Sequence, residues 1–147
     1  MTKFLLSLHV VAAIIAVGPV AVAASMFPRA LRQASASEDP DAVTGLRLLH
    51  RVCRVYAGIA IAVPVFGFAT ASNMGVLGSA WLITAITLTA VAAAVLGLWI
   101  LPAQQAALEE VTAVAASRLA AAAGVFNLLW ATVTVLMIVR PGSTTGA

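Results

Sequence analysis

Four stretches of this chain are long and apolar enough to cross a lipid bilayer as helices. A helix needs about twenty apolar residues to span the ~30 Å hydrocarbon core of a membrane. The predicted spans cover residues 4–27, 48–71, 80–102 and 118–139. The sequence therefore predicts an all-α fold, a bundle of four transmembrane helices in a single domain over residues 1–147, with a flexible tail over residues 141–147.

The composition agrees with a chain that faces lipid. Of its 147 residues, 63% are hydrophobic and only 9% are charged, whereas about a quarter of the residues in a soluble domain are charged. Nucleic acid would require a dense basic stripe with aromatic side chains, which the eight basic residues do not form, so no nucleic-acid partner is expected. Cys53 is the only cysteine, which excludes an internal disulfide and a multi-cysteine metal site.

The first span has a second interpretation as a secretory signal peptide. Residues 1–25 combine a basic start, an apolar run and an Ala-x-Ala-like ending. However, His9 lies inside the apolar run, and the run continues to Phe27. These two features favour a retained transmembrane helix over a cleaved peptide.

Lysine and arginine are distributed unequally between the two sides of the predicted bundle. The first and third connections carry Arg29, Arg32, Arg47, Arg51, Arg54 and Arg118, whereas the opposite side carries only Lys3 and Arg140. Basic residues accumulate in cytoplasmic connections. The asymmetry therefore predicts a multi-pass protein of the cytoplasmic membrane with both termini on the same, outer side.

The start of the second span presents a cationic face. At ~100° per residue, Arg47, His50, Arg51 and Arg54 fall within an arc of roughly 100° on one side of a helix. The positive-inside rule is one explanation for these charges. The other is an anion site: a helix N-terminus favours anions, and this face could hold a phosphate, a lipid headgroup or the propionates of a porphyrin.

Small residues recur at four-residue steps in the last two spans. Such steps let transmembrane helices approach one another closely. They predict helix-packing positions at Ala85, Thr89, Ala93, Gly97, Ala116, Ala120 and Gly124. Gly18-Pro19 and Pro64 are expected to kink the first and second helices, because each proline removes a backbone hydrogen bond.

Polar side chains are scarce inside the spans. No aspartate, glutamate or lysine lies within them, which disfavours proton-coupled transport. Asn127 is expected to form an interhelical hydrogen bond, and His9 is expected to have a partner such as a hydroxyl, a cofactor or water. Glu109 and Glu110, on an extension of the third helix, are expected to meet the arginines of the first connection.

The two histidines raise a haem hypothesis. His9 lies near the outer end of the first span and His50 at the inner edge of the second, on the order of 20 Å apart across the ~30 Å hydrocarbon core. Two axial imidazoles would each have to lie within about 2 Å of one iron, so these two cannot share a metal. The remaining arrangement is a haem on His50 alone, with its propionates on the arginine face.

Several short motifs follow one another along the chain: His9, Gly18, FPRALR at the end of the first span, SAWLITA, LWILPAQQ and LMIVRPG. In this order the chain resembles, over nearly its whole length, an uncharacterised family of small bacterial four-helix membrane proteins. The first span also resembles the opening helix of the copper-resistance D proteins and of the membrane protoporphyrinogen oxidases. Resemblance to the oxidases implies haem binding and porphyrin oxidation, with His9 and Arg29 at the matching positions. The chain departs from the oxidases because it lacks a second intramembrane histidine and a conventional redox motif.

The expected function is that of a small accessory or scaffold component that acts through helix–helix contacts. Its expected partners are the lipid bilayer and another membrane protein or a second copy of the chain. This interpretation includes no catalytic residue, metal site or cofactor. The alternative is a haem- or porphyrin-binding membrane redox protein that uses His9, His50 and Arg29.

Overall fold

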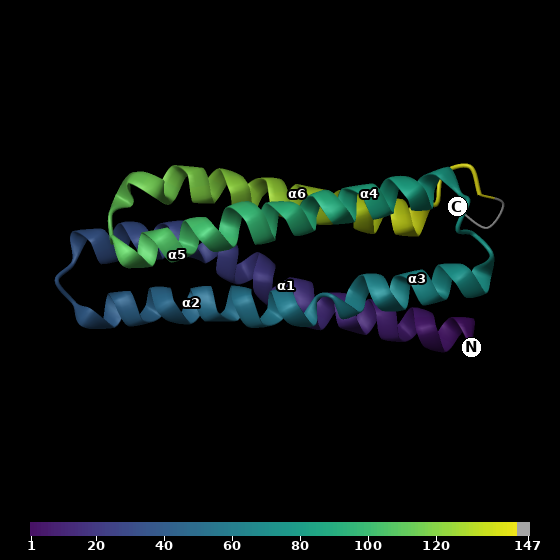
Figure 1. Ribbon diagram of the computed structural model, residues 1–147, viewed down its shortest axis with the longest axis horizontal. Coiled ribbons are helices and arrows are strands. Elements are labelled where there is room, and N and C mark those ends of the chain that lie inside the picture. Colours follow the sequence, from purple (N-terminus) through teal and green to yellow (C-terminus); the bar gives the residue numbers. More distant parts are fainter. Residues whose placement is uncertain (144–147) are drawn as a thin grey trace.

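The computed structural model describes residues 1–143, and every regular element in that range is a helix (Figure 1). The elements are α1 (Thr2–Ala36), α2 (Pro40–Ile59), α3 (Ala62–Met74), α4 (Ala80–Ala94), the π-helical segment η1 (Val95–Ile100), α5 (Leu101–Glu109), the 3₁₀ turn η2 (Ala113–Ala115) and α6 (Ala116–Val139). They form four rods, because α3 continues α2, and η1 and α5 continue α4. The predicted all-α four-helix architecture is confirmed. The last four residues of the predicted tail lie outside the described range.

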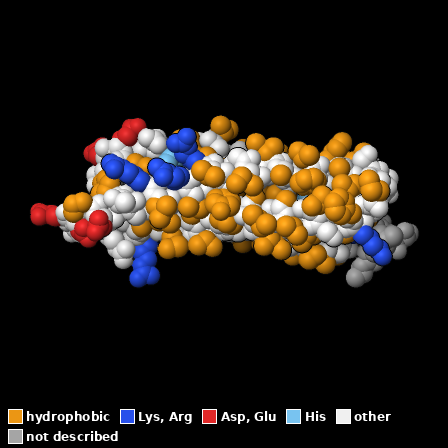
Figure 2. Space-filling view, turned by 90° about the horizontal axis from the view of Figure 1, so that it is seen from below, with side chains coloured by type: hydrophobic (Ala, Val, Ile, Leu, Met, Phe, Trp, Pro, Cys, Tyr) orange, Lys and Arg blue, Asp and Glu red, His pale blue; other side chains and the backbone are white. Residues whose placement is uncertain are grey.

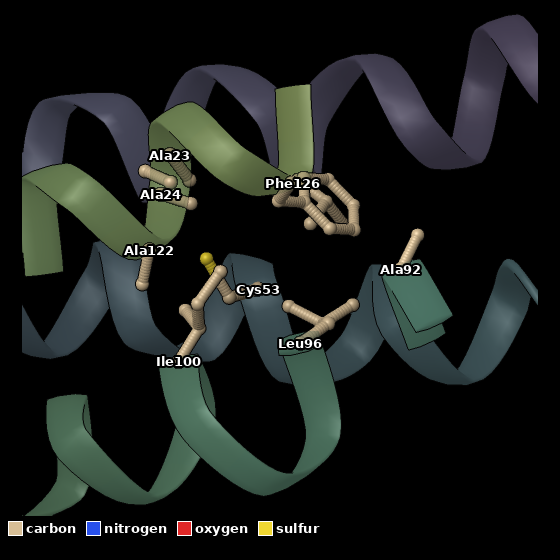
Figure 3. Close-up of a cluster of buried hydrophobic side chains, with 10 residues drawn as sticks. Ala23, Ala24, Cys53, Ala92, Leu96, Ile100, Ala122 and Phe126 are labelled. Carbon is tan, nitrogen blue, oxygen red and sulfur yellow. The ribbon is translucent and has the colours of Figure 1, made fainter. Parts of the chain in front are cut away.

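The rods run side by side along the whole molecule. α1 packs against α2, α3 and α6, while α4 pairs with α6 and α2 pairs with α5. The N-terminus and the end of α6 lie at the same end of the bundle, as predicted, and we call it the terminal end (Figure 1). The central core joins side chains from all four rods, among them Cys53, Leu96 and Phe126 (Figure 3). A second cluster around Phe27 and Leu46 keeps the bundle packed toward the opposite end.

A broad apolar belt covers the middle of the molecule, and the charged side chains gather toward its ends (Figure 2). Each of the four rods is long and apolar enough to cross a membrane. Large apolar side chains stand outward on the belt: Ile14 is 68% exposed, Ile138 71% and Leu98 80%. Apolar surface of this extent is not left in contact with water. The protein is therefore a multi-pass membrane protein whose belt faces lipid.

The helices extend past the predicted spans at the end opposite the termini, which we call the arginine end. α1 has 35 residues, or about 52 Å at 1.5 Å per residue, which exceeds the ~30 Å hydrocarbon core. The first predicted connection, which carries Arg29 to Arg54, is therefore largely helical, and only residues 37–39 link α1 to α2. Asp39 caps α2 by accepting a hydrogen bond from the Asp41 N–H, and Pro40 takes the first helical position.

Pro19 and Pro64, both predicted to kink their helices, have different effects. α1 passes through Pro19 without interruption. The second rod, by contrast, is broken between α2 and α3 at Ala60 and Ile61. The Pro64 ring has no N–H and clashes with the carbonyl group four residues earlier, that of Ala60, which accounts for the position of the break.

Some of the residues predicted to pack between helices are buried, and the others are exposed. Ala85 and Ala116 are buried, and Thr89 is partly buried. The exposed members are Ala93, Gly97, Ala120 and Gly124. A Cβ added to either of these two glycines would meet no atom within 4 Å. Ala120 and Gly124 are therefore not covered by another helix in the described chain, because α6 instead buries a neighbouring face that includes Leu119 and Phe126. On the α4–η1 rod, the buried residues are Ala92 and Leu96, next to the exposed Ala93 and Gly97.

Candidate functional site

One face of α2 forms a hollow at the arginine end of the bundle. The hollow has a volume of about 470 Å³, and we call it the arginine hollow. Its lining consists of Arg47, His50, Arg51, Arg54, Val55 and Leu108. The histidine and the arginines follow the helical spacing i, i+3, i+4 and i+7, which places them on one side of α2. Figure 2 shows histidine atoms between groups of basic side chains at this end of the molecule.

His50 is the buried member of the arginine hollow. It is only 6% exposed, and its Nδ1 lies 3.0 Å from Oε1 of Gln104 on α5. Gln104 is fully buried and donates a hydrogen bond from its Nε2 to Sγ of Cys53, at 3.6 Å. Because an amide oxygen only accepts, Nδ1 of His50 carries the hydrogen of this contact.

The second ring nitrogen of His50, Nε2, is buried and has no hydrogen-bond partner among residues 1–143. Buried polar atoms in folded proteins are nearly always hydrogen-bonded, and an unpaired one costs about 1–3 kcal/mol. Nδ1 faces Gln104 in the interior, while the same ring lines the arginine hollow. Nε2 is therefore the ring nitrogen of His50 that has no partner in the described chain.

The arginines of the hollow are exposed and carry no ion pair with any residue from 1 to 143. Within the described chain, no carboxylate lies within 4.0 Å of the guanidinium groups of Arg47, Arg51 and Arg54. The prediction that Glu109 and Glu110 meet these arginines is wrong over this range. Both glutamates are exposed at the end of α5, where the chain turns toward η2. Residues 1–143 thus supply three positive charges to the hollow and no counter-charge.

A helix N-terminus does not contribute to the arginine hollow, although the sequence suggests one. α2 begins at Pro40, about two turns before Arg47, and Asp39 caps its first turn. The free N–H groups that make a helix start attractive to anions are confined to that first turn. The predicted contribution of a helix terminus is therefore wrong, and the positive field of the hollow comes from side chains.

His9 occupies a different environment from His50. Its Nδ1 lies 2.8 Å from the carbonyl oxygen of Val63, so the imidazole donates a hydrogen bond from α1 to α3. The ring fits directly against Gly67, where an added Cβ would lie 2.8 Å from Cε1 of His9. His9 therefore has a partner, but it is a backbone carbonyl group rather than the expected hydroxyl, cofactor or water, and the residue joins two helices.

The residues predicted to bind haem do not come together. Arg29 follows His9 by twenty residues on α1, which separates them by about 30 Å along the helix axis. His50 precedes Val63, the contact of His9, by thirteen residues, or about 20 Å. His9 therefore cannot share a porphyrin with Arg29 or a metal ion with His50. No group of three metal-binding side chains of histidine, cysteine, aspartate or glutamate occurs in residues 1–143.

Gln104 is the site residue that the sequence motifs do not reveal. It lies between Ile100 and Ala107 on the buried face of η1 and α5. The steps of four and three residues place the three side chains on the same side of the helix. A polar residue in such an apolar stripe needs a hydrogen-bond partner, which is the signal that could have identified it.

Asn127, by contrast, is predicted correctly, because its Nδ2 donates a hydrogen bond from α6 to Oγ of Ser25 on α1, at 2.9 Å.

Comparisons of the chain with family models, with curated proteins and with solved structures found no match. The arginine hollow is therefore interpreted from its own residues, an unpartnered imidazole nitrogen beside three guanidinium groups without ion pairs in the described chain.

Proposed function

We propose that this protein is an accessory component of the bacterial cytoplasmic membrane that acts by binding other membrane components, and that its arginine hollow binds an anionic, phosphate-bearing headgroup. The observation that carries the proposal is the buried Nε2 of His50, which has no partner in the described chain and belongs to a ring that lines the hollow. Three arginines line the same hollow. Guanidinium forks suit the several oxygens of a phosphate, and an imidazolium ring offers an Nε2–H donor for another.

Membrane orientation alone accounts for part of this arrangement. The positive-inside rule explains why six of the eight basic residues lie toward one end of the bundle, and each arginine near the surface attracts anionic lipid by about 1 kcal/mol. The rule does not explain why His50 is buried among these arginines and held by Gln104. A positioned side chain of this kind is what a specific site has in addition to a general attraction to the membrane surface.

The position of the hollow along the bundle also favours a headgroup. No charged residue occurs between Arg54 and Glu109, so Arg54 marks the edge of the apolar belt. Lipid phosphates lie at that edge. The long side chains of the arginines can keep their charged groups at the interface while their apolar stems lie along the belt.

Contacts with another transmembrane helix are the second part of the proposed accessory role. Ala120 and Gly124 of α6 are exposed on the apolar belt, and no atom lies within 4 Å of a Cβ added at Gly124. Small residues at this spacing let a further helix approach closely. The proposed partner is another membrane protein or a second copy of this chain.

Haem binding is the alternative function, and His50 is the ligand that the geometry favours for it. A metal-binding histidine commonly donates its other ring N–H to a fixed acceptor, as His50 does to Gln104. The arginines could bind the propionates, but their positive charge favours an anion over a metal cation in the hollow. A Soret band that disappears in His50→Ala and persists in His9→Ala would support this alternative.

Native mass spectrometry in mild detergent tests the headgroup proposal, with phosphatidylglycerol or phosphatidylcholine added to the purified protein. We expect the wild type to retain phosphatidylglycerol preferentially, and Arg51→Gln to weaken that retention about tenfold, because a charged hydrogen bond is lost. Arg118→Gln is the matched control, since it removes the same charge at an exposed position that does not line the hollow. Equal losses in the two variants would indicate general attraction and would contradict a specific site.

A further inference from the structure

A second concave surface lies next to the arginine hollow, within the apolar belt. It encloses about 280 Å³, and we call it the apolar groove. Val20 of α1 and Phe126 of α6 contribute to its floor, and its walls are the α2–α3 rod and the α4–η1 rod. Figure 1 shows these two rods in front, with α1 behind the space between them. The rim residues Ile61 and Gly97 are exposed, so the groove opens toward lipid.

Irregular helix geometry occurs in both walls of the apolar groove. One wall contains the break at Ala60 and Ile61, and the other contains η1, whose Gly97 lines the groove. Small side chains at Ala60, Ala93 and Gly97 leave the space open, and a Cβ added to Gly97 would meet no atom within 4 Å. Such π-helical segments often occur at functional sites. The groove therefore exists because the side chains that would fill it are absent.

The apolar groove begins where the arginine hollow ends. Along α2, Arg54 lines the hollow and Ala57 lines the groove, three residues and about 4.5 Å further along the same helix face. Along α5, Leu101 lines the groove and Leu108 lines the hollow. A separation of seven residues places these two leucines on the same helix face, about 10 Å apart along the axis. The two concave surfaces thus lie end to end, one cationic and one apolar.

We infer that the arginine hollow and the apolar groove together bind one amphipathic molecule, a phosphate-bearing lipid with its phosphate in the hollow and a hydrocarbon chain in the groove. This inference rests on the proposed headgroup function and extends it to the chain. The three arginines, which have no carboxylate partner in the described part of the chain, select an anionic group, and the groove selects an apolar chain. A helix about 10 Å across is too wide for a groove of about 280 Å³, whereas a single hydrocarbon chain is not.

A diacyl phospholipid and a polyprenyl phosphate share this chemistry. Both carry an anionic phosphate on a flexible hydrocarbon chain, so the geometry of the site accepts either. The mass of the lipid that co-purifies with the wild-type protein distinguishes them. Phosphatidylglycerol serves as the probe for comparing variants.

Gly97→Leu tests the inference, because a leucine side chain there fills the groove and leaves the hollow intact. Gly58→Leu is the matched control: Gly58 is also exposed, an added Cβ also meets no atom within 4 Å, and the residue does not line the groove. We expect Gly97→Leu to weaken retention of phosphatidylglycerol in native mass spectra about tenfold and Gly58→Leu to leave it unchanged. Ala93→Leu fills the same groove from α4 and replaces Gly97→Leu if that variant fails to fold by circular dichroism.

Arg51→Gln is measured alongside and separates the two proposals. Losses in both Arg51→Gln and Gly97→Leu are the expected result. A loss in Arg51→Gln with wild-type retention in Gly97→Leu and Ala93→Leu would overturn the chain site and leave the headgroup function standing. Wild-type retention in Arg51→Gln would overturn the headgroup function, and the inference with it.

Discussion

Nδ1 of His50 lies 3.0 Å from Oε1 of Gln104, and this contact joins α2 to α5 beside the arginine hollow. Both side chains are buried, His50 at 6% exposure and Gln104 at 0%. The contact fixes the tautomer and the orientation of the imidazole. It therefore also fixes the position of Nε2, the atom that the proposed headgroup contacts.

Gln104→Leu should weaken both the fold and the site. The substitution removes the acceptor of the His50 Nδ1–H, and a buried donor left unpaired costs about 1–3 kcal/mol of unfolding free energy. Retention of phosphatidylglycerol should also fall, because the imidazole is no longer held. Gln105→Leu changes an exposed neighbour and should affect neither property. Unfolding in detergent and native mass spectrometry measure the two effects, and a fully stable Gln104→Leu variant would show that the hydrogen bond contributes nothing.

Gly67→Ala should destabilise the protein, because the added Cβ would lie 2.8 Å from Cε1 of His9. Overpacking of this kind costs about 1–3 kcal/mol. Gly58→Ala is the control, since an added Cβ there meets no atom within 4 Å and alanine favours a helix by up to about 1 kcal/mol. In a His9→Ala background, Gly67→Ala should lose most of its effect. Strictly additive changes in thermal unfolding would contradict the contact.

Ser25→Ala should weaken the contact between α1 and α6. Oγ of Ser25 accepts a hydrogen bond from Asn127 and donates one to the carbonyl oxygen of Ala21. Interhelical hydrogen bonds in membranes contribute about 0.6–2 kcal/mol, so we expect a loss in that range from unfolding in detergent. Ser7→Ala removes only a bond within α1, to the carbonyl oxygen of Lys3, and should have a smaller effect. If both variants lose the same amount, the interhelical bond adds no stability.

The four-helix fold could be predicted because membrane thickness sets the length of each apolar stretch. No knowledge of contacts between helices is needed for that step. The helix ends at the arginine end could not be placed in the same way, since α1, α2 and α5 continue into polar sequence. The thickness of the hydrocarbon core does not limit the length of a helix outside the membrane. One local signal was available there, because aspartate followed by proline, as in Asp39 and Pro40, is a common helix start.

The candidate site could be predicted only in part. The cationic face from Arg47 to Arg54 follows from helical periodicity, because it lies within two turns of one helix. The contact between His50 and Gln104 joins residues 54 positions apart, and periodicity within one helix does not indicate which residue lies opposite. The contact predicted between Glu109 and the arginines is wrong for the same reason. The rotation of α5 about its axis decides which of its side chains face α2, and the sequence of one helix does not indicate this rotation. Glu109 is exposed, and Gln104 is buried.

The central claim is that Nε2 of His50 contacts a bound phosphate, and ¹⁵N nuclear magnetic resonance of the imidazoles tests it most directly. The chain has two histidines, so the spectrum is simple. His9 serves as an internal control, because its imidazole is hydrogen-bonded to the carbonyl oxygen of Val63, away from the hollow. Phosphatidylglycerol should shift the Nε2 resonance of His50 and leave His9 unchanged, and phosphatidylcholine should shift neither. An unchanged His50 resonance, or equal shifts of both histidines, would contradict the claim.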